Sequence, residues 1–268
     1  MLARLGATLA ALVTAVHLVW AEQLRVVSIG GSVTEIIYAL GQESRLVGVD
    51  TSSVFPQAAT RLPQVGYQRQ LGAEGVLSLK PTLILATADA GPPATMAQLQ
   101  QSGVRVVIVP NDHSLTGAQE KIRATARALD CAARGEELAK QLDPPRVMFV
   151  LARAGGVLSV AGEGTAADAM ITLAGGVNAV RGYSGYKPLT AEAAVAAAPD
   201  VILTTTRALE SVGGAEKLVA EPGLALTPAG KNRRVVALED LYLLGFGPRT
   251  RQAVRELAVR LQEPESAR

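Results

Sequence analysis

A tyrosine and an arginine two residues apart are the side chains of this chain best suited to chemistry. Tyr67 follows Gly66 and precedes Arg69, and Pro63 lies just upstream, in a chain with only 3% aromatic residues. Proline and glycine disfavour a helix, so we expect Tyr67 on a loop. A loop phenol beside a guanidinium can give a phenolate oxygen to a ferric iron. The alternative is that Tyr67 merely packs at the edge of its loop. For a tyrosine considered without its context, packing is a commoner role than binding iron.

Histidine and cysteine are too scarce for most other metal or nucleophilic sites. If the segment containing His17 is removed, His113 is the only histidine left. A site of several imidazoles or a zinc site of Cys and His is then excluded. No Gly-x-Ser-x-Gly elbow accompanies His113, so a Ser-His-Asp triad is not expected. Cys131 is the single cysteine, which excludes an internal disulfide.

Residues 1–21 have the layout of a secretory signal peptide. Arg4 precedes an apolar run from Leu5 to Trp20 that contains no acid, and Ala21 is a small residue suited to cleavage. The run is short for an uncleaved membrane anchor. No cysteine follows it, so lipid attachment is not expected. The sequence predicts a soluble periplasmic protein comprising residues 22–268.

The charge balance gives no sign of a nucleic-acid partner. The formal net charge is +2 and falls to +1 when Arg4 is removed with the leader. A near-neutral chain lacks the electrostatic attraction that phosphate backbones require.

Short apolar runs alternate with amphipathic stretches, a pattern typical of an α/β protein with parallel sheets. Strands are predicted at Arg25–Ile29, Leu46–Val49, Leu83–Ala86, Val104–Val109, Arg146–Leu151, Val157–Val160, Val201–Thr205 and Val235–Leu238. Helices are predicted at Val33–Leu40, Ala73–Leu79, Ala94–Gln101, Gln119–Leu129, Ala166–Ala174, Ala191–Ala197, Gly214–Ala220 and Thr250–Leu261.

The two halves of the chain are related to each other. Residues 72–87 align with 190–205 at a constant offset of 118, and six of the sixteen positions are identical. We therefore expect two Rossmann-like lobes, at residues 22–115 and 143–268. A helical connector at 116–142, with a break at Gly135, should join them. A ligand cleft is expected between the lobes.

Five segments of the chain carry a family resemblance. They are residues 28–41, 62–82, 161–180, 182–193 and 241–250. Through them, nearly all of the mature chain resembles the periplasmic haem-binding proteins of bacterial haemin ABC importers. These belong to the helix-linked substrate-binding proteins (class III, or cluster A), a class that also serves cobalamin and siderophores. The Val-Gly-Tyr-x-Arg element at 65–69 is the specific part of the resemblance.

The resemblance implies that Tyr67 is the axial ligand of ferric haem b and that Arg69 is the cation beside it. A free tyrosine has a pKa near 10, so its phenol must be deprotonated to bind iron at neutral pH. A neighbouring guanidinium stabilises the phenolate and can also pair with a haem propionate.

The resemblance also implies a docking role for two glutamates. Glu74 and Glu192, which are equivalent in the internal repeat, match the surface acids that bind arginines of an ABC permease dimer in the inner membrane. The alternative is that each acid only complements the dipole of the helix it begins. The protein itself is expected to be a monomer.

The sequence indicates less clearly which residues of the second lobe contact the haem. No histidine exists in that half, so a six-coordinate Tyr/His iron is excluded. Arg249 could meet a propionate or cap the loop before it. The relatives also carry a longer helix than this chain does before Pro144. The candidate pocket residues are Tyr183, Tyr186, Tyr242, Phe246 and Arg249.

Two other functions are alternatives to haem delivery. A cobalamin or iron–siderophore receptor would share the two-lobed plan. An enzyme or nucleotide binder could use Gly30-Gly31-Ser32 after the first strand, but neither a dinucleotide fingerprint nor a P-loop is present. No paired acid and base suggests catalysis, so we expect a binding protein rather than an enzyme.

Overall fold

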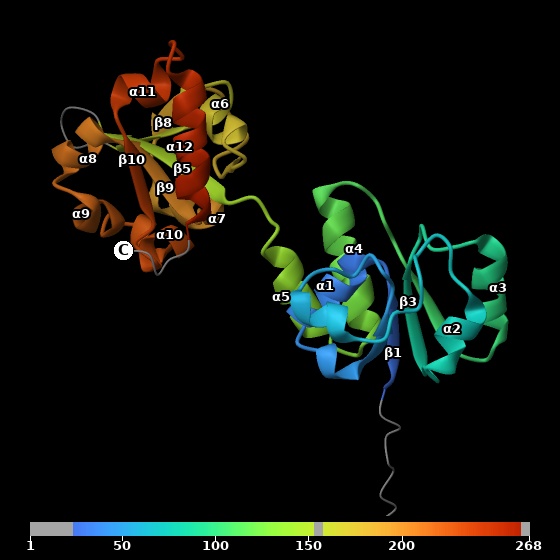
Figure 1. Ribbon diagram of the computed structural model, residues 1–268. Helices are drawn as coiled ribbons and strands as arrows, with labels where there is room; N and C mark the ends of the chain where they lie inside the picture. The colour runs from blue at the N-terminus through green and yellow to red at the C-terminus, as the bar shows by residue number, and fades with distance from the viewer. Residues whose placement is uncertain (1–23, 153–157, 264–268) are drawn as a thin grey trace, which may run out of the picture. The chain divides into compact units, whose positions relative to one another are not determined.

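A computed structural model of the protein describes residues 24–152 and 158–263, and it divides the chain after Leu142 into two compact units (Figure 1). The predicted signal peptide lies outside the described residues. Within the described residues, no helix is both long enough and apolar enough to cross a membrane.

The first unit is built on a four-stranded parallel sheet with the strand order β2-β1-β3-β4. The strands are β1 (Val26–Ile29), β2 (Leu46–Val49), β3 (Leu83–Thr87) and β4 (Arg105–Val109). β1 and β3 occupy the centre, and every residue in both is buried. Near-continuous runs of branched apolar residues suit strands that are covered on both faces.

Helices cover both faces of this sheet. Successive strand residues point to opposite faces, so Val26 packs with α1 and α4 while Val27 packs with α2 and α3. The elements are α1 (Gly31–Ala39), α2 (Ala73–Ser78), α3 (Pro93–Gln101) and α4 (Leu115–Ala128), with the 3-10 turns η1 (Glu43–Arg45) and η2 (Gln57–Arg61).

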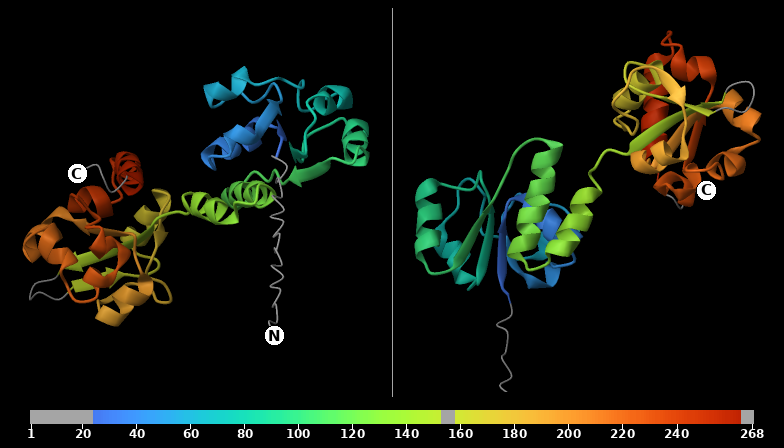
Figure 2. Two further views of the ribbon diagram at one scale, coloured as in Figure 1. Left: turned by 90° about the horizontal axis from the view of Figure 1, so that it is seen from below. Right: turned by 180° about the vertical axis from the view of Figure 1, so that it is seen from behind.

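The stretch predicted as a connector forms two helices that pack on each other, α4 and α5 (Ala132–Lys140), seen as the two green helices in Figure 2. The predicted break at Gly135 is wrong. The helices separate at Asp130, which has φ +57, whereas a Cβ at Gly135 would lie 2.2 Å from the Cβ of Ala126. The glycine therefore allows close helix contact rather than a break.

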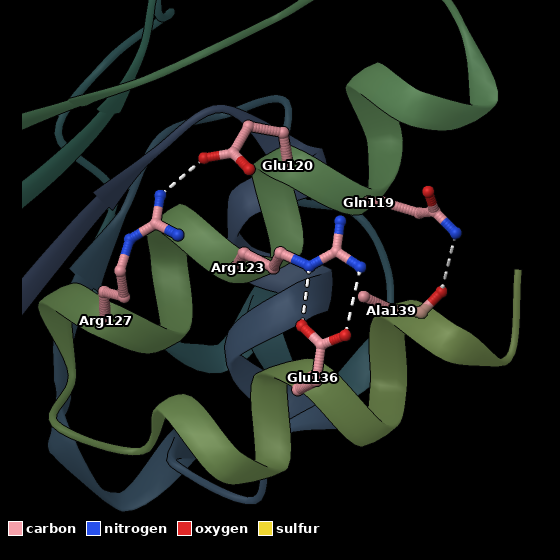
Figure 3. A network of polar contacts seen from close by, with 6 residues as sticks. All are labelled: Gln119, Glu120, Arg123, Arg127, Glu136 and Ala139. Atoms are coloured by element: carbon pink, nitrogen blue, oxygen red, sulfur yellow. Dashed lines mark hydrogen bonds and ion pairs between the residues drawn. The ribbon is translucent and has the colours of Figure 1, made fainter.

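Polar contacts also join α4 to α5 (Figure 3). The Arg123 guanidinium donates from Nε and Nη2 to the two carboxylate oxygens of Glu136, at 2.7 and 3.2 Å. The Gln119 amide donates to the Ala139 carbonyl at 3.2 Å. Both helices belong to the first unit, which ends at Leu142.

The second unit contains a mixed sheet with the order β10-β9-β5-β6-β8 and with β7 paired to β5. The strands are β5 (Arg146–Ala152), β6 (Leu158–Ala161), β7 (Val177–Asn178), β8 (Tyr186–Pro188), β9 (Val201–Thr205) and β10 (Val235–Leu238). The α/β class is confirmed, but an all-parallel sheet is wrong here, because β6 runs antiparallel to β5 and to β8. Residues 153–157 are too short a link for a parallel crossover.

Helices flank this sheet on both faces. Val147 and Phe149 pack with α6, α11 and α12, whereas Met148 and Val150 pack with α7, α9 and α10. The elements are α6 (Ala166–Leu173), α7 (Ala191–Ala197), α8 (Thr206–Val212), α9 (Ala215–Val219), η3 (Leu224–Leu226), α10 (Pro228–Lys231), α11 (Asp240–Leu244) and α12 (Thr250–Gln262).

Each predicted strand and helix has a counterpart with similar bounds in the structure; residue 157 of one predicted strand lies outside the described residues. The sequence pattern missed β7, β8, α8, α10 and α11. These elements have two to seven residues, which is too short for periodicity to reveal them.

Candidate functional site

Tyr67 lies on the loop between β2 and α2, as predicted, and main-chain hydrogen bonds hold this loop in place. The Gly66 carbonyl accepts from the Thr51 N–H at 2.9 Å, and the Tyr67 carbonyl accepts from the Gln70 N–H at 2.8 Å. Gly66 has φ +99, a conformation that favours glycine. The Tyr67 residue is 43% exposed, so its side chain reaches solvent.

The Tyr67 loop meets the sheet where its central strands end. A Cβ at Gly30, the residue after β1, would lie 2.5 Å from the Thr87 methyl group and 3.2 Å from the Gln68 side-chain oxygen. Gln68, next to Tyr67, is therefore beside the carboxyl ends of β1 and β3. Ligands of parallel α/β sheets bind outside these strand ends.

A buried carboxylate fixes the turn that follows β1. Asp50 is fully buried, and its Oδ1 accepts from the Gly30 N–H at 2.8 Å and from the Ser53 hydroxyl at 3.0 Å. Its Oδ2 accepts from the Ser52 N–H at 3.0 Å. Sequence reasoning missed Asp50, although an acid directly after a buried strand was a usable signal. The Asp50 carboxylate thus holds the turn after β1 against the segment after β2.

A chain of polar contacts extends from Arg69 along the same edge. The Arg69 guanidinium lies 3.8 Å from the Asp89 carboxylate, which accepts from the Asn111 amide at 2.5 Å. Lys121 donates to the Asn111 side-chain oxygen at 2.5 Å. The polar contacts found among the described residues include none between the Tyr67 phenol and Arg69. The Arg69 side chain is 62% exposed and can reach a ligand.

Two further large apolar side chains are exposed near this loop. Val54 and Phe55 follow β2 and are 69% and 62% exposed. Their loop begins at Thr51, which bonds to Gly66 beside Tyr67. These two adjacent side chains therefore offer apolar surface to a ligand that reaches the loop. Sequence reasoning missed both, although phenylalanine is rare in this chain.

The two repeated glutamates occupy equivalent positions in the two units. Glu74 lies in the first turn of α2, which precedes β3, and Glu192 lies in the first turn of α7, which precedes β9. Both residues are exposed. The placement is compatible with docking and with the simpler helix-dipole role.

Tyr242, Phe246 and Arg249 follow the carboxyl end of β10. The Arg249 guanidinium carbon lies 5.0 Å from the Tyr242 ring centroid, and its Nη2 is 3.4 Å from Glu239 Oε2. Phe246 is 45% exposed. Arg249 thus has protein partners on this loop and also remains largely exposed, so both predicted roles fit the geometry.

Glu239 is the anchor of this cluster. Its two carboxylate oxygens accept from the Leu241 and Tyr242 N–H groups, each at 2.8 Å. These two bonds, helped by Arg249, lower the pKa of the Glu239 carboxyl below its ordinary value. Burial, helped by nearby Glu256, raises the pKa of the Tyr242 phenol. Tyr242 therefore stays protonated at neutral pH.

Tyr183 and Tyr186 pack on opposite faces of the sheet. Tyr186 packs with the core face that holds α6, α11 and α12, with its ring 6.5 Å from that of Phe149 in an edge-on arrangement. Tyr242 packs against the same core face. Tyr183 packs on the opposite face, under the Lys187 ammonium at 4.1 Å from the ring centroid. The structure therefore separates Tyr183 from Tyr186 and Tyr242.

The described part of the chain offers no conventional metal site. Within it, no group of three or more His, Cys, Asp or Glu side chains is arranged to hold a metal ion. A single phenolate such as Tyr67 can still complete the coordination of an iron that a macrocycle already holds.

Comparison with known proteins places this chain among binding proteins of transporters. The family described as "Periplasmic binding protein" matches residues 26–145 and 138–242. An uncharacterized ABC transporter substrate-binding lipoprotein of Bacillus subtilis, YvrC, is 27% identical over 88% of this chain and 79% of its own length. A vitamin B12-binding protein of Vibrio vulnificus is 26% identical over 91% of this chain and 92% of its own length.

Solved structures of higher sequence identity are named as haem-binding proteins. RhuT from Roseiflexus sp. RS-1 is 46% identical over 90% of this chain and 98% of its own, with a TM-score of 0.45. BhuT, solved with two haems, is 47% identical over 89% of this chain and 97% of its own, with a TM-score of 0.44. The identities are substantial, whereas the superpositions are weak.

Proposed function

This chain belongs to the periplasmic binding protein family, and we propose that it captures ferric haem in the periplasm through a Tyr67 phenolate and delivers it to an ABC permease. Serving an ABC importer is common to the family and involves no catalysis. Our proposal adds three points to that family role: the ligand is haem, Tyr67 binds its iron, and Glu74 and Glu192 dock on the permease.

One observation carries the choice of ligand: a solvent-exposed phenol lies on a fixed loop beside the carboxyl ends of a parallel sheet, two residues from a largely exposed guanidinium. A phenolate is a suitable axial ligand for ferric haem. The guanidinium favours the ionised phenol and can pair with a propionate. Val54 and Phe55 offer apolar surface for the porphyrin ring.

The names of similar proteins support the same choice. Proteins named as haem-binding are 46% and 47% identical to this chain, whereas the vitamin B12-binding protein of Vibrio vulnificus is 26% identical. The alternative is that the ligand is cobalamin or an iron–siderophore. It rests on the curated relatives, which include several vitamin B12-binding proteins. Those ligands do not need the phenolate.

In the second unit we propose Tyr242, Phe246 and Arg249 as contacts to the haem, because all three follow the carboxyl end of β10 and the Arg249 guanidinium lies over the Tyr242 ring. Tyr183 and Tyr186, which come from β8 and the segment before it, are left out of this part of the proposal. The transported haem is haem b, and the transporting form is a monomer that lacks residues 1–21 and carries no lipid.

A haemin titration of purified protein tests the proposal. The wild type should bind about one haemin with a Soret band, and Tyr67→Phe should lower the affinity at least about tenfold, because even outer partners of a metal ligand matter by 10–100-fold. Tyr38→Phe, which removes a hydroxyl on α1, is the matched control. A parallel titration with cyanocobalamin tests the alternative that the protein binds cobalamin rather than haem. Haemin binding by Tyr67→Phe that equals the wild type would overturn the proposed ligation.

A further inference from the structure

The second unit contains a cavity that the proposed haem site does not use. Its volume is about 560 Å³, and it lies between β8 and α7 on the face of the sheet that carries Met148. Its lining includes Arg146, the first residue of β5, so it extends toward the amino ends of the parallel strands. The proposed haem contacts of this unit follow the opposite, carboxyl ends.

The lining of this cavity is positively charged. Arg146, Arg181 and Lys187 line it, and none of the lining residues that the structure describes is acidic. The nearby carboxylates of Asp200 and Glu163 accept main-chain N–H groups, from Arg146 at 2.9 Å and from Gly182 at 3.2 Å. Three cations without a lining carboxylate favour an anionic occupant.

Tyr183 contributes its ring, rather than its hydroxyl, to the site. The hydroxyl is buried out of reach of a ligand, whereas the residue lines the cavity. The Lys187 ammonium lies 4.1 Å from the centroid of the Tyr183 ring. This cation–π contact helps to hold the lysine cation at the cavity.

Apart from Thr190 and Tyr183, the rest of the lining is apolar. Met148 and Val160 come from the sheet, Ala179 and Val180 from the segment after β7, and Ala193 from α7. A pocket with an apolar surface and a few converging polar groups is the usual form of a small-molecule site. Its volume suits a molecule of one or two rings.

We propose that this cavity binds a small organic acid, a carboxylate or sulfonate on an apolar body, with Lys187 and Arg181 holding the acid group. The site lies wholly within the second unit. It is independent of Tyr67 and of the choice of haem as the transported ligand.

Calorimetric titration with 1-naphthoate, compared with its neutral analogue 1-naphthamide, tests the proposal. The acid should bind one molecule per chain, and the amide should bind at least about tenfold more weakly, since charge-assisted hydrogen bonds are about twice as strong as neutral ones. Equal affinity for the two compounds, or no binding of the acid, would overturn the proposal.

Two tryptophan substitutions on the same helix locate the binding. Ala193→Trp narrows the cavity, whereas Val195→Trp changes an exposed side chain of α7 outside the lining. The first should abolish naphthoate binding and the second should leave it unchanged. Binding that is equal in both variants contradicts the assignment. Should Ala193→Trp fail to fold, Lys187→Met decides, with an expected loss of about fivefold for the acid only.

The same titration separates this proposal from the haem proposal. Tyr67→Phe should bind naphthoate like the wild type, whatever its effect on haemin. A loss of naphthoate binding in Tyr67→Phe would show that the probe occupies the first unit and would overturn the cavity assignment.

Discussion

At the scale of residues, the proposed ligand tyrosine is presented by a loop that is already held in shape. The Gly66 and Tyr67 carbonyls accept main-chain hydrogen bonds from Thr51 and Gln70, and the Asp50 carboxylate holds the neighbouring turn at Gly30. A site fixed before binding loses little conformational entropy when the ligand arrives.

Arg69 should contribute to haem affinity through its charge. Its pairing with Asp89 is long, at 3.8 Å, and largely exposed, so it competes only weakly with a ligand. We expect Arg69→Ala to weaken haemin binding about tenfold and Arg69→Lys to restore part of it. Spectroscopic titration measures both. Arg61→Ala, which removes an exposed arginine of η2, should bind haemin normally; an equal loss in that variant would mean that overall charge, rather than position, matters.

Sequence reasoning found some of these residues and missed others for a physical reason. Pro63 and Gly66 mark a loop locally, so the setting of Tyr67 was predictable. Asn111 meets Asp89, and Lys121 meets Asn111, only because β3 and β4 are neighbours and α4 follows them. Nothing in the local sequence records that neighbourhood, so those contacts required the structure.

At the scale of elements, the α4–α5 pair shows how one small residue sets a helix contact. Gly135 lies within α5 where a Cβ would overlap the Cβ of Ala126. The sequence pattern suggested a break because glycine is a poor helix former. Close packing between two helices overrides that preference and makes the glycine part of the interface.

Gly135→Ala should therefore destabilise the protein, although the same change usually stabilises an exposed helix. The 2.2 Å overlap with Ala126 must be relieved by separating the helices, and overpacking of this kind costs about 1–3 kcal/mol. Urea unfolding measures the change. The control is Gly75→Ala in α2, where the added Cβ meets its nearest neighbour at 3.9 Å; stabilisation in both variants would contradict the packing argument.

The cap of α11 should make stability depend on acidity. Hydrogen bonds from Leu241 and Tyr242, with Arg249 nearby, lower the pKa of Glu239 in the folded protein. This contribution is present above the unfolded-state pKa and is lost as the pH falls through the folded one. Glu239→Gln should lower Tm at pH 7, because one oxygen is replaced by an amide donor that faces an N–H.

The Tm difference between Glu239→Gln and wild type should shrink as the pH is lowered from 7 to 3, because the Glu239 carboxylate of the wild type then takes up a proton. Thermal unfolding at both pH values checks this. Glu210→Gln, at an exposed position of α8, is the control and should change Tm little at either pH. A difference that persists unchanged at pH 3 would contradict the role of the ionised cap.

At the scale of the whole molecule, the internal repeat predicts a two-sided docking surface and a one-sided iron site. Glu74 and Glu192 begin equivalent helices, whereas the Val-Gly-Tyr-x-Arg loop has no copy in the second half. The β7 and β8 strands and the antiparallel β6 further distinguish the second unit.

Glu74→Ala and Glu192→Ala should each reduce haem transport in vesicles containing the cognate permease, and the double variant should reduce it further. Haemin affinity of the purified variants should stay within about twofold of the wild type, since both glutamates are exposed and distinct from the Tyr67 loop. Glu210→Ala serves as the surface control. Full transport by the double variant would contradict the docking role. The presence of Glu74 and Glu192 would then be explained by the helix dipole alone.

The central position of β1 also bears on when this protein can fold. β1 is the first strand described and lies between β2 and β3, with all four of its residues buried. The first sheet therefore cannot close until the beginning of the chain is free to enter its middle. Any partner that holds Leu24 and Arg25, the residues just before β1, would therefore keep this strand out of the sheet and delay folding of the first unit.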